Sequence, residues 1–343
     1  MRHLVFDSPG KLHWRETPDL RINGDRDVIV RPLAVARCDL DPAIATGAHA
    51  MQEPFAMGHE MVGEIVDVGD GAGTWSPGQC VIVPFQISCG DCSNCVAGRS
   101  NACTSVPHGS AFGLGRFGDV DYGGALADLV RVPYADHLLL ALPDGLDPVA
   151  AAGIPDNVSD GYRCVAGPLR EWPGAPVLVV AGLAPSVGLY AVAAAIALGA
   201  ERVVYIDHDP KRLSFATEFG AEAREIPVKA LHDLRLERSF PIVVDACVFE
   251  RGRTFALKST APCGTCTSVS GGAREATVPL SKMYFDGIRY EIGRVHARAI
   301  APAVIDLVTS GRLNPAAIVT DIVAFDDAPE AMNEPSVKMV FVP

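Results

Sequence analysis

The chain has 343 residues, of which 49% are hydrophobic and 20% charged, and its net charge is −12. This length exceeds the usual size of one hydrophobic core and predicts two domains. The acidic balance argues against nucleic acid or an anionic membrane as a partner. The first residues lack the apolar run of a signal peptide, and the most apolar stretch, 187–198, is too short to span a bilayer. We therefore expect a cytoplasmic enzyme.

The first part of the chain has the pattern of a β-rich domain. Short apolar or alternating runs at 28–35, 61–69 and 80–85 are strand candidates. Long helical patterns are scarce before residue 145. Residues 1–150 are therefore predicted to form a β-rich, irregular domain.

The pattern changes after residue 150, where apolar strands alternate with helices. The strand candidates are 177–180, 202–206, 242–244 and 266–269, and the helix candidates between them are 187–198 and 211–219. Such alternation indicates βαβ units and a doubly wound parallel sheet, so we expect an α/β fold over 151–297. A helix at 299–309 and a strand at 338–342 follow.

Four cysteines lie close together within residues 86–106. Cys89, Cys92, Cys95 and Cys103 are separated by two, two and seven residues. In a chain without a secretion signal, clustered cysteines indicate a metal site before disulfides. Four thiolates form a closed tetrahedral zinc site. An iron–sulfur cluster or reduced thiols remain alternatives.

A second set of ligand types surrounds Gly58-His59-Glu60. Cys38 lies upstream and Asp156 downstream. A catalytic zinc commonly takes three protein ligands and leaves a fourth position for water or substrate. One thiol, one imidazole and one carboxylate are sufficient for this. The other reading of Asp156 is a helix N-cap after Pro155.

The loop after the strand 177–180 has a degenerate dinucleotide fingerprint. Of a Gly-x-Gly-x-x-Gly pattern only Gly188 is in register, and the expected pyrophosphate-binding positions are Gly182, Ala184, Pro185, Ser186, Val187 and Gly188. Asp207 ends the next strand, 19 residues after Gly188, where a carboxylate accepts the ribose hydroxyls of NAD. The alternative interpretation is that Asp207 caps the helix that follows. Lys211 and Arg212 leave some room for a phosphate, so NADP stays open as the less favoured alternative to NAD.

With these motifs, and with Gly123-Gly124-Ala125-Leu126-Ala127-Asp128, the chain resembles the zinc-dependent alcohol dehydrogenases of the medium-chain dehydrogenase/reductase superfamily. The resemblance covers nearly the whole length. It implies a GroES-like catalytic domain, a Rossmann domain, and a return of residues 298–343 to the catalytic domain. It also implies two zinc ions per subunit, one catalytic and one structural, and a dimer or tetramer. The strand at 290–293 is the expected sheet edge for pairing.

The resemblance also assigns roles to single residues. Cys38 matches the first ligand of the catalytic zinc, Asp41 the supporting acid, and His59, 21 residues after Cys38, the second ligand. Glu60 matches an acidic neighbour that can approach the metal, and Asp156 matches the third ligand. A rival register leaves Ala36 at the first position, but a site with two ligands would be poorly held.

Two departures from the family pattern affect the chemistry. Leu40 stands where the family usually has a Ser or Thr that passes on the alcohol proton. Asp160 stands where Thr is frequent near the nicotinamide, and it could replace this relay, bind a substrate amine or be exposed. Cys263 and Cys266 resemble a metal pair, but we interpret them as core thiols.

The sequence predicts an enzyme that transfers a hydride between a nicotinamide cofactor and an alcohol/carbonyl pair. The other hypotheses are a reductase of an activated alkene or iminium in which zinc is not essential, and a non-catalytic, zinc-stabilised binding protein.

Overall fold

The computed structural model describes residues 1–73, 75–271 and 275–343. Within it the chain divides into two compact units. The first unit comprises Met1–Ser159, His296–Thr309 and Val319–Pro343, and the second comprises Asp160–Val295 and Ser310–Ile318. Residues 151–159 and 296–297, which we expected in the nucleotide-binding half, belong to the first unit, and Ser310–Ile318, expected in the C-terminal return, belong to the second.

The first unit is built from two sheets. Its strands are β1 (Arg2–Ser8), β2 (Lys11–Glu16), β3 (Val28–Ala36), β4 (Phe55–Ala56), β5 (Glu60–Val68), β6 (Cys80–Val83), β7 (Val130–Val132), β8 (Leu140–Ala141), β15 (Asp321–Ala324) and β16 (Met339–Val342). The smaller sheet has the order β2-β1-β4, and the larger has β15-β16-β3-β5-β6-β8 with β7 also paired to β3. This is the β-rich domain that the sequence predicts.

The first unit also contains helices, most of them short. They are α1 (Asp41–Ala45), α2 (Ser93–Val96), η1 (Ser100–Ala102), α3 (Ala135–Leu138), α4 (Pro148–Ala151), η2 (Ile154–Val158), α10 (Ala297–Thr309), η5 (Phe325–Asp327) and α11 (Ala328–Ala331). The segment η2 is a π-helical turn. Such turns are rare and often occur at functional sites.

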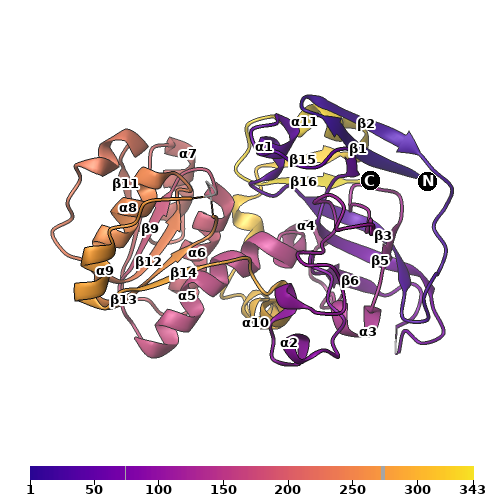
Figure 1. Ribbon diagram of the computed structural model, residues 1–343, viewed down its shortest axis with the longest axis horizontal. Helices are drawn as coiled ribbons and strands as arrows, with labels where there is room; N and C mark the ends of the chain where they lie inside the picture. The colour runs from indigo at the N-terminus through magenta and orange to yellow at the C-terminus, as the bar shows by residue number, and fades with distance from the viewer. Residues whose placement is uncertain (74, 272–274) are drawn as a thin grey trace. The chain divides into compact units, whose positions relative to one another are not determined.

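The central strand β3 pairs with strands from both ends of the chain. It runs antiparallel to β5, with Ala36 opposite Glu60, and antiparallel to β16, with Ala36 opposite Val340. Figure 1 shows the C-terminal strands β15 and β16, in yellow, among the indigo and violet strands of the first unit. The pairing places the residues after β3 beside those that begin β5 and those that precede β16.

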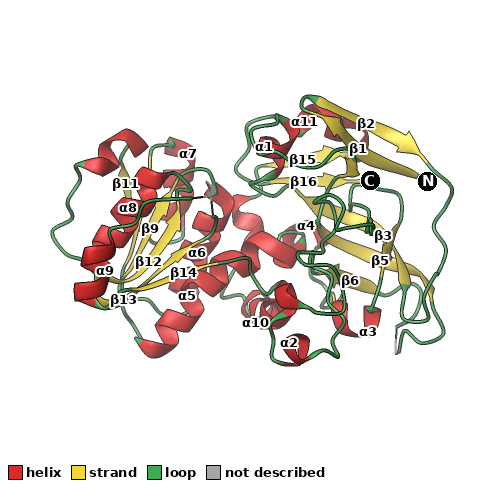
Figure 2. Cartoon of the chain, in the orientation of Figure 1, coloured by secondary structure: helices red, strands yellow, loops and turns green. Residues whose placement is uncertain are grey.

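The second unit is a doubly wound parallel sheet, as predicted. Its strands are β9 (Val177–Ala181), β10 (Val203–Asp207), β11 (Glu222–Glu225), β12 (Phe240–Ala246), β13 (Thr260–Ser268) and β14 (Arg289–Ile292). They are parallel in the order β11-β10-β9-β12-β13-β14, so β14 lies at an edge. Helices flank the sheet (Figure 2). They are α5 (Ser159–Glu171), which begins at the last residue of the first unit, α6 (Pro185–Ala197), α7 (Pro210–Glu218), η3 (Val228–His232), α8 (Glu250–Ser259), α9 (Leu280–Asp286) and η4 (Pro315–Ile318).

The order of the sheet follows from the sequence. Strands β9, β10 and β12 are buried at nearly every position, as expected for central strands covered on both faces. The outer strand β11 has the burial pattern of an edge, with two exposed and two half-buried residues.

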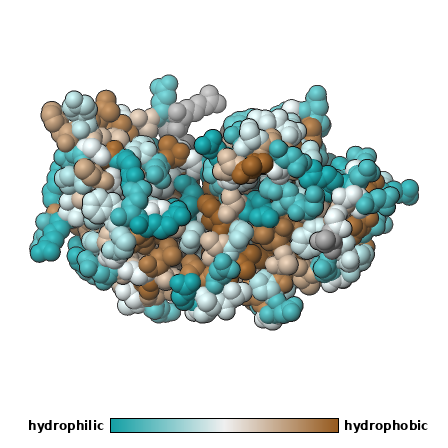
Figure 3. Space-filling model, turned by 90° about the horizontal axis from the view of Figure 1, so that it is seen from below, coloured by the Kyte–Doolittle hydropathy of each residue, from teal (hydrophilic) through white to brown (hydrophobic). Residues whose placement is uncertain are grey.

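No helix among the described residues is both long and apolar enough to cross a bilayer. Apolar residues nevertheless reach the surface among polar ones on the face shown in Figure 3. Among the large exposed apolar side chains, Leu280, Tyr284 and Phe285 all belong to α9.

The strand β16 provides a test of how the first unit is stabilised. Phe341 is fully buried in its main core, whereas Ile322 on the neighbouring β15 is 60% exposed. We predict that Phe341→Ala lowers the free energy of unfolding by about 3–5 kcal/mol, because it removes buried surface and leaves a cavity. The matched change Ile322→Ala should cost about 0.5 kcal/mol or less. Denaturant titration measures both, and equal losses would contradict this assignment of the core.

Candidate active site

Four predicted metal ligands meet at the end of β3. Ligand atoms of Cys38, His59, Glu60 and Asp156 all lie within 4.8 Å of one another, and the four side chains are buried. The thiol of Cys38 and Nε2 of His59 each lie 3.5 Å from Oδ2 of Asp156. The register of the sheet explains the positions of the first three residues, because Cys38 lies shortly after β3, Glu60 begins the paired strand β5, and His59 directly precedes it.

Asp156 reaches this cluster from η2. It lies within the π-helical turn and is not an N-cap, so its reading as a capping residue is wrong. The π-helical turn is followed directly by α5, which begins at Ser159. The hydroxyl of Ser159 donates to the carbonyl of Ile154 at 2.7 Å and ties the two ends of the turn together.

The electrostatics of the cluster call for a cation. Burial, with the charge of Asp156, raises the pKa of the Cys38 thiol well above its ordinary value. Burial lowers the pKa of His59, but the carboxylates of Asp41 and Asp156 outweigh burial and raise it to about 9. A thiolate and two carboxylates cannot remain ionised together in a buried site unless positive charge compensates them. A divalent metal would supply that charge and stabilise the deprotonated ligands.

A second observation also fits a metal. Nδ1 of His59 and Oδ1 of Asp41 are buried, and neither has a hydrogen-bond partner among the described residues. The two atoms lie 3.7 Å apart. Oδ2 of Asp41 is held at 2.9 Å by the backbone N–H of Cys38. A small closure lets Nδ1–H of His59 donate to Asp41, which leaves Nε2 as the ligand atom. The donor set therefore fits zinc.

Lys338 is a buried member of the site that the sequence analysis did not identify. Its ammonium donates to both carboxylate oxygens of Glu60, at 3.0 and 2.9 Å, and to the carbonyl of Arg37 at 2.9 Å. Burial alone lowers the pKa of Lys338, but the charge of Glu60 outweighs burial and raises it. The sequence contains one sign of this role, because Lys338 begins the otherwise apolar strand candidate at the C-terminus. Such a lysine needs a carboxylate partner.

The cysteine lobe is the second metal cluster. Ligand atoms of Cys89, Cys92, Cys95 and Cys103 lie within 4.8 Å of one another. The sulfurs of Cys92 and Cys103 are 3.9 Å apart, close to the separation of about 3.8 Å that four Zn–S bonds of about 2.3 Å impose. Backbone N–H groups lower the pKa of Cys92 to about 5, whereas burial raises that of Cys95 to about 12. A cation is again needed to hold four thiolates. The described cysteines form no disulfide.

The predicted cofactor loop joins β9 to α6. Gly182 is required there, because a Cβ at this position would lie 2.6 Å from the carbonyl oxygen of Cys247. A Cβ on Gly188 would contact the side chain of Ala246 at 3.3 Å, so this glycine allows close packing of helix and strand. The N-cap Ala184 gives α6 no side-chain hydrogen bond, and Pro185 begins the helix. The N-terminus of α6 thus has the features that suit a pyrophosphate.

Asp207 and Arg212 are brought together at the end of β10. The carboxylate of Asp207 is buried and accepts two hydrogen bonds from the guanidinium of Arg212, at 2.8 and 2.7 Å. It also accepts from the hydroxyl of Tyr205 at 2.7 Å and from the N–H of His208 at 2.6 Å. The residue that the sequence assigns to cofactor selection is therefore covered by a cation, which must move if ribose hydroxyls are to reach it.

Two predicted residues are placed differently from expectation. The carboxylate of Asp160 forms a salt bridge with Arg163, which also donates to the carbonyl of Gly293 at 2.7 Å. This pairing gives Asp160 a structural partner in its own helix and leaves its catalytic role without support. The interpretation of Cys263 as a core thiol is wrong, because it is exposed at a left-handed position in β13 (φ 60°). Cys266 is fully buried, as expected.

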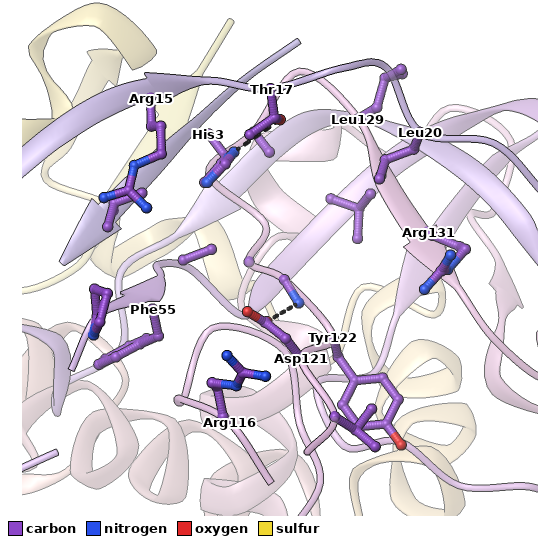
Figure 4. Close-up of a pocket in the computed structure, with 18 of the residues that line it drawn as sticks. His3, Arg15, Thr17, Leu20, Phe55, Arg116, Asp121, Tyr122, Leu129 and Arg131 are labelled. Atoms are coloured by element: carbon purple, nitrogen blue, oxygen red, sulfur yellow. Dashed lines mark hydrogen bonds between the residues drawn. The ribbon is translucent and has the colours of Figure 1, made fainter. Parts of the chain in front are cut away.

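A separate cavity of about 850 Å³ lies in the first unit (Figure 4). Its lining residues come from β1 and β2 and from the segments 17–27, 52–56, 116–124 and 127–133. Its arginine and carboxylate side chains are Arg15, Arg116, Arg131, Asp27, Glu53, Asp119 and Asp121. This mixture of charges gives no clear preference for an anion or a cation, and none of the eight predicted zinc ligands lines the cavity.

Comparisons with known proteins agree with this chemistry. The alcohol dehydrogenase GroES-like domain matches residues 24–144, and the zinc-binding dehydrogenase domain matches residues 186–310. A "probable zinc-binding alcohol dehydrogenase" of Mycobacterium tuberculosis is 30% identical over 96% of this chain and 83% of its own. The glutathione-independent formaldehyde dehydrogenase of Pseudomonas aeruginosa is 33% identical over 80% of this chain and 73% of its own.

A solved structure is similar along the whole length. The alcohol dehydrogenase of Thermus sp. ATN1 has a TM-score of 0.87 and 29% identity, covering 100% of this chain and 99% of that one. These similarities do not favour the hypotheses of a zinc-independent reductase or of a non-catalytic binding protein.

Metal content tests the two clusters separately. We predict that the purified protein holds two zinc ions per chain by plasma mass spectrometry, and that Cys38→Ser and Cys95→Ser each retain one, because each substitution removes a ligand from one cluster only. Cys95→Ser should also lower the free energy of unfolding, since a structural zinc contributes to folding. Two zinc ions in Cys38→Ser would contradict the ligand set.

Proposed function

Because the chain belongs to the zinc-dependent alcohol dehydrogenases of the medium-chain dehydrogenase/reductase superfamily, we propose that Cys38, His59 and Asp156 hold its catalytic zinc. The protein is a zinc-dependent oxidoreductase with a nicotinamide cofactor, and it interconverts a small alcohol and its carbonyl. The observation that carries the proposal is the convergence of these ligand atoms, with one of Glu60, within 4.8 Å.

Each residue has a separate task in the proposed reaction. When bound, zinc polarises the substrate oxygen and lowers the pKa of the alcohol. In the proposed site Nδ1–H of His59 would donate to Asp41, which lies 3.7 Å away, and Nε2, which faces Asp156, would bind the metal. Glu60 is held by Lys338 beside the ligands, and in the proposal it approaches the metal only when this ion pair opens. Leu40 has no hydroxyl to accept the alcohol proton, so that proton leaves by another route.

We expect NAD as the cofactor, bound at Gly182, Ala184, Pro185, Ser186, Val187 and Gly188. Asp207 would accept the ribose hydroxyls, and its negative charge would repel the extra phosphate of NADP. Arg212 must move away from Asp207 when the ribose hydroxyls of NAD bind to this carboxylate. The freed guanidinium of Arg212 could then bind the extra phosphate of NADP. The preference for NAD therefore depends on whether repulsion by Asp207 outweighs attraction by Arg212.

A homo-oligomer is the expected state. The edge strand β14 is open to pairing, and Ile292 on it is 50% exposed. On α9, Leu280, Tyr284 and Phe285 are 69%, 80% and 80% exposed. Exposed apolar side chains of this size and an open sheet edge both favour association of subunits. A cytoplasmic location remains a prediction from the sequence.

A turnover screen tests the proposed function. Short alcohols, polyols and aldehydes, including formaldehyde because of the named relative, are offered with NAD(H) and NADP(H), and absorbance at the nicotinamide band is followed. We predict turnover by the natural protein and a loss of about 100-fold or more in Cys38→Ser, because a zinc site that has lost a ligand no longer polarises the substrate. Undiminished turnover in Cys38→Ser would refute the role of this residue.

A second prediction concerns Asp207. Asp207→Ser should lower kcat/KM for NAD by about 10- to 100-fold, because a hydrogen bond to a charged group is lost. The ratio of activity with NADP to activity with NAD should rise, since the repulsion of the phosphate disappears. Thermal unfolding is the control, because it shows whether the variant stays folded without the salt bridge between Asp207 and Arg212. An unchanged cofactor ratio in a folded variant would contradict the selection role.

A further inference from the structure

Asn157 lies between the buried ion pair and the predicted metal ligands. It is 2% exposed and follows Asp156 on the π-helical turn η2. Its Oδ1 accepts a hydrogen bond of 2.7 Å from Nζ of Lys338. Its Nδ2 donates to the sulfur of Cys38 at 3.4 Å and to Oδ2 of Asp156 at 3.2 Å. The side chain of Asn157 therefore contacts Lys338 of the ion pair on one side and the predicted ligands Cys38 and Asp156 on the other.

The orientation of this amide follows from chemistry. An ammonium group only donates hydrogen bonds, so the amide atom that faces Lys338 must be the oxygen. The NH₂ group then has to face Cys38 and Asp156, which are acceptors when they are ionised for metal binding. Asn157 thus stabilises both ligands most strongly in their anionic forms, which accept stronger hydrogen bonds than the protonated ones. A leucine of similar size at this position would fill the space but could do neither.

We propose that Asn157 is a positioning residue that couples the Lys338–Glu60 ion pair to Cys38 and Asp156 and sets how strongly these two ligands donate to the catalytic zinc. This inference rests on the proposed function, because it takes Cys38 and Asp156 as zinc ligands. Asn157 itself is not a ligand. It acts through the atoms that are.

The physical consequence concerns the charge on the sulfur. A hydrogen bond to a thiolate withdraws electron density from it, so the thiolate donates less to the metal and the metal stays a stronger Lewis acid. This counteracts the charge that Cys38 and Asp156 together place on the zinc. The coupling also links metal chemistry to Glu60, since Lys338 contacts Glu60 and Asn157 at the same time. If Glu60 leaves Lys338, the amide of Asn157 loses a fixed partner.

The test uses cobalt as a spectroscopic probe in the full-length protein. Cobalt(II) replaces zinc in the catalytic site while zinc is kept in the cysteine lobe, and the sulfur-to-cobalt charge-transfer band of the near ultraviolet is recorded. In Asn157→Leu this band should shift to longer wavelength, because a thiolate without its hydrogen bond gives up an electron more readily. Affinity for the catalytic zinc, measured by competition with a chelator, should fall by about 10-fold or more, because Cys38 and Asp156 lose the amide that holds them in position.

Two further variants keep the test decisive. Asn157→Ser has a side chain too short to reach both partners, so it should show the same spectral shift even if Asn157→Leu does not fold. Asn314→Ala, at an exposed residue that accepts from the N–H of Ala316, should leave spectrum and affinity unchanged. Lower stability with an unshifted band and unchanged zinc affinity would show a merely structural role and overturn the inference. Two zinc ions and normal turnover in the natural protein would show that the proposed function survives this outcome. A natural protein without catalytic zinc would overturn both.

Discussion

The antiparallel pairing of β3 with β5 on one side and β16 on the other is the constraint on which the site depends. Cys38 lies two residues after β3, Glu60 begins β5 with His59 directly before it, and Lys338 directly precedes β16. A shift of one residue in either pairing would turn the side chains of a strand to the opposite face of the sheet. The thiol, the imidazole and the buried ion pair would then no longer meet. The core around Phe341 and Met61, both fully or almost fully buried, therefore fixes the register and with it the chemistry.

Charge compensation is the second organising principle of the site. The buried acids Asp41, Glu60 and Asp156 surround one imidazole and one thiol, and the permanent cation among the contacts described is Lys338. The ammonium group of Lys338 donates its hydrogen bonds to Glu60, Asn157 and the carbonyl of Arg37. A protonated His59 can balance Asp156 before a metal binds, but an ionised Cys38 beside a neutral, metal-binding His59 requires a further cation. The site is thus arranged so that a divalent ion completes it electrostatically, and Glu60 is neutralised from the opposite side.

The sequence predicted the fold and the ligand clusters for physical reasons that act locally. Alternating and continuous apolar runs predicted β5 and β9, and the spacing of Cys89, Cys92, Cys95 and Cys103 predicted a closed site from turn chemistry alone. The contacts of Lys338 and Asn157 could not be predicted in this way. Lys338 lies 278 residues from Glu60 in sequence, and only the three-dimensional pairing of β16 brings them together. The salt bridge of Asp160 with Arg163, three residues on in the same helix, was also not predicted, and the catalytic role of Asp160 stays a prediction.

The separation in sequence also distinguishes how the two metal clusters can be assembled. All ligands of the cysteine lobe fall within one short segment, with Cys89 and Cys103 only 14 residues apart. That lobe can capture its ion as soon as the segment has left the ribosome. The other cluster is supported by Lys338, which directly precedes β16, and this strand is synthesised after the whole second unit. Metal loading during biosynthesis should therefore be sequential, with the stabilising ion taken up early and the reactive one only after the last strand has joined the sheet.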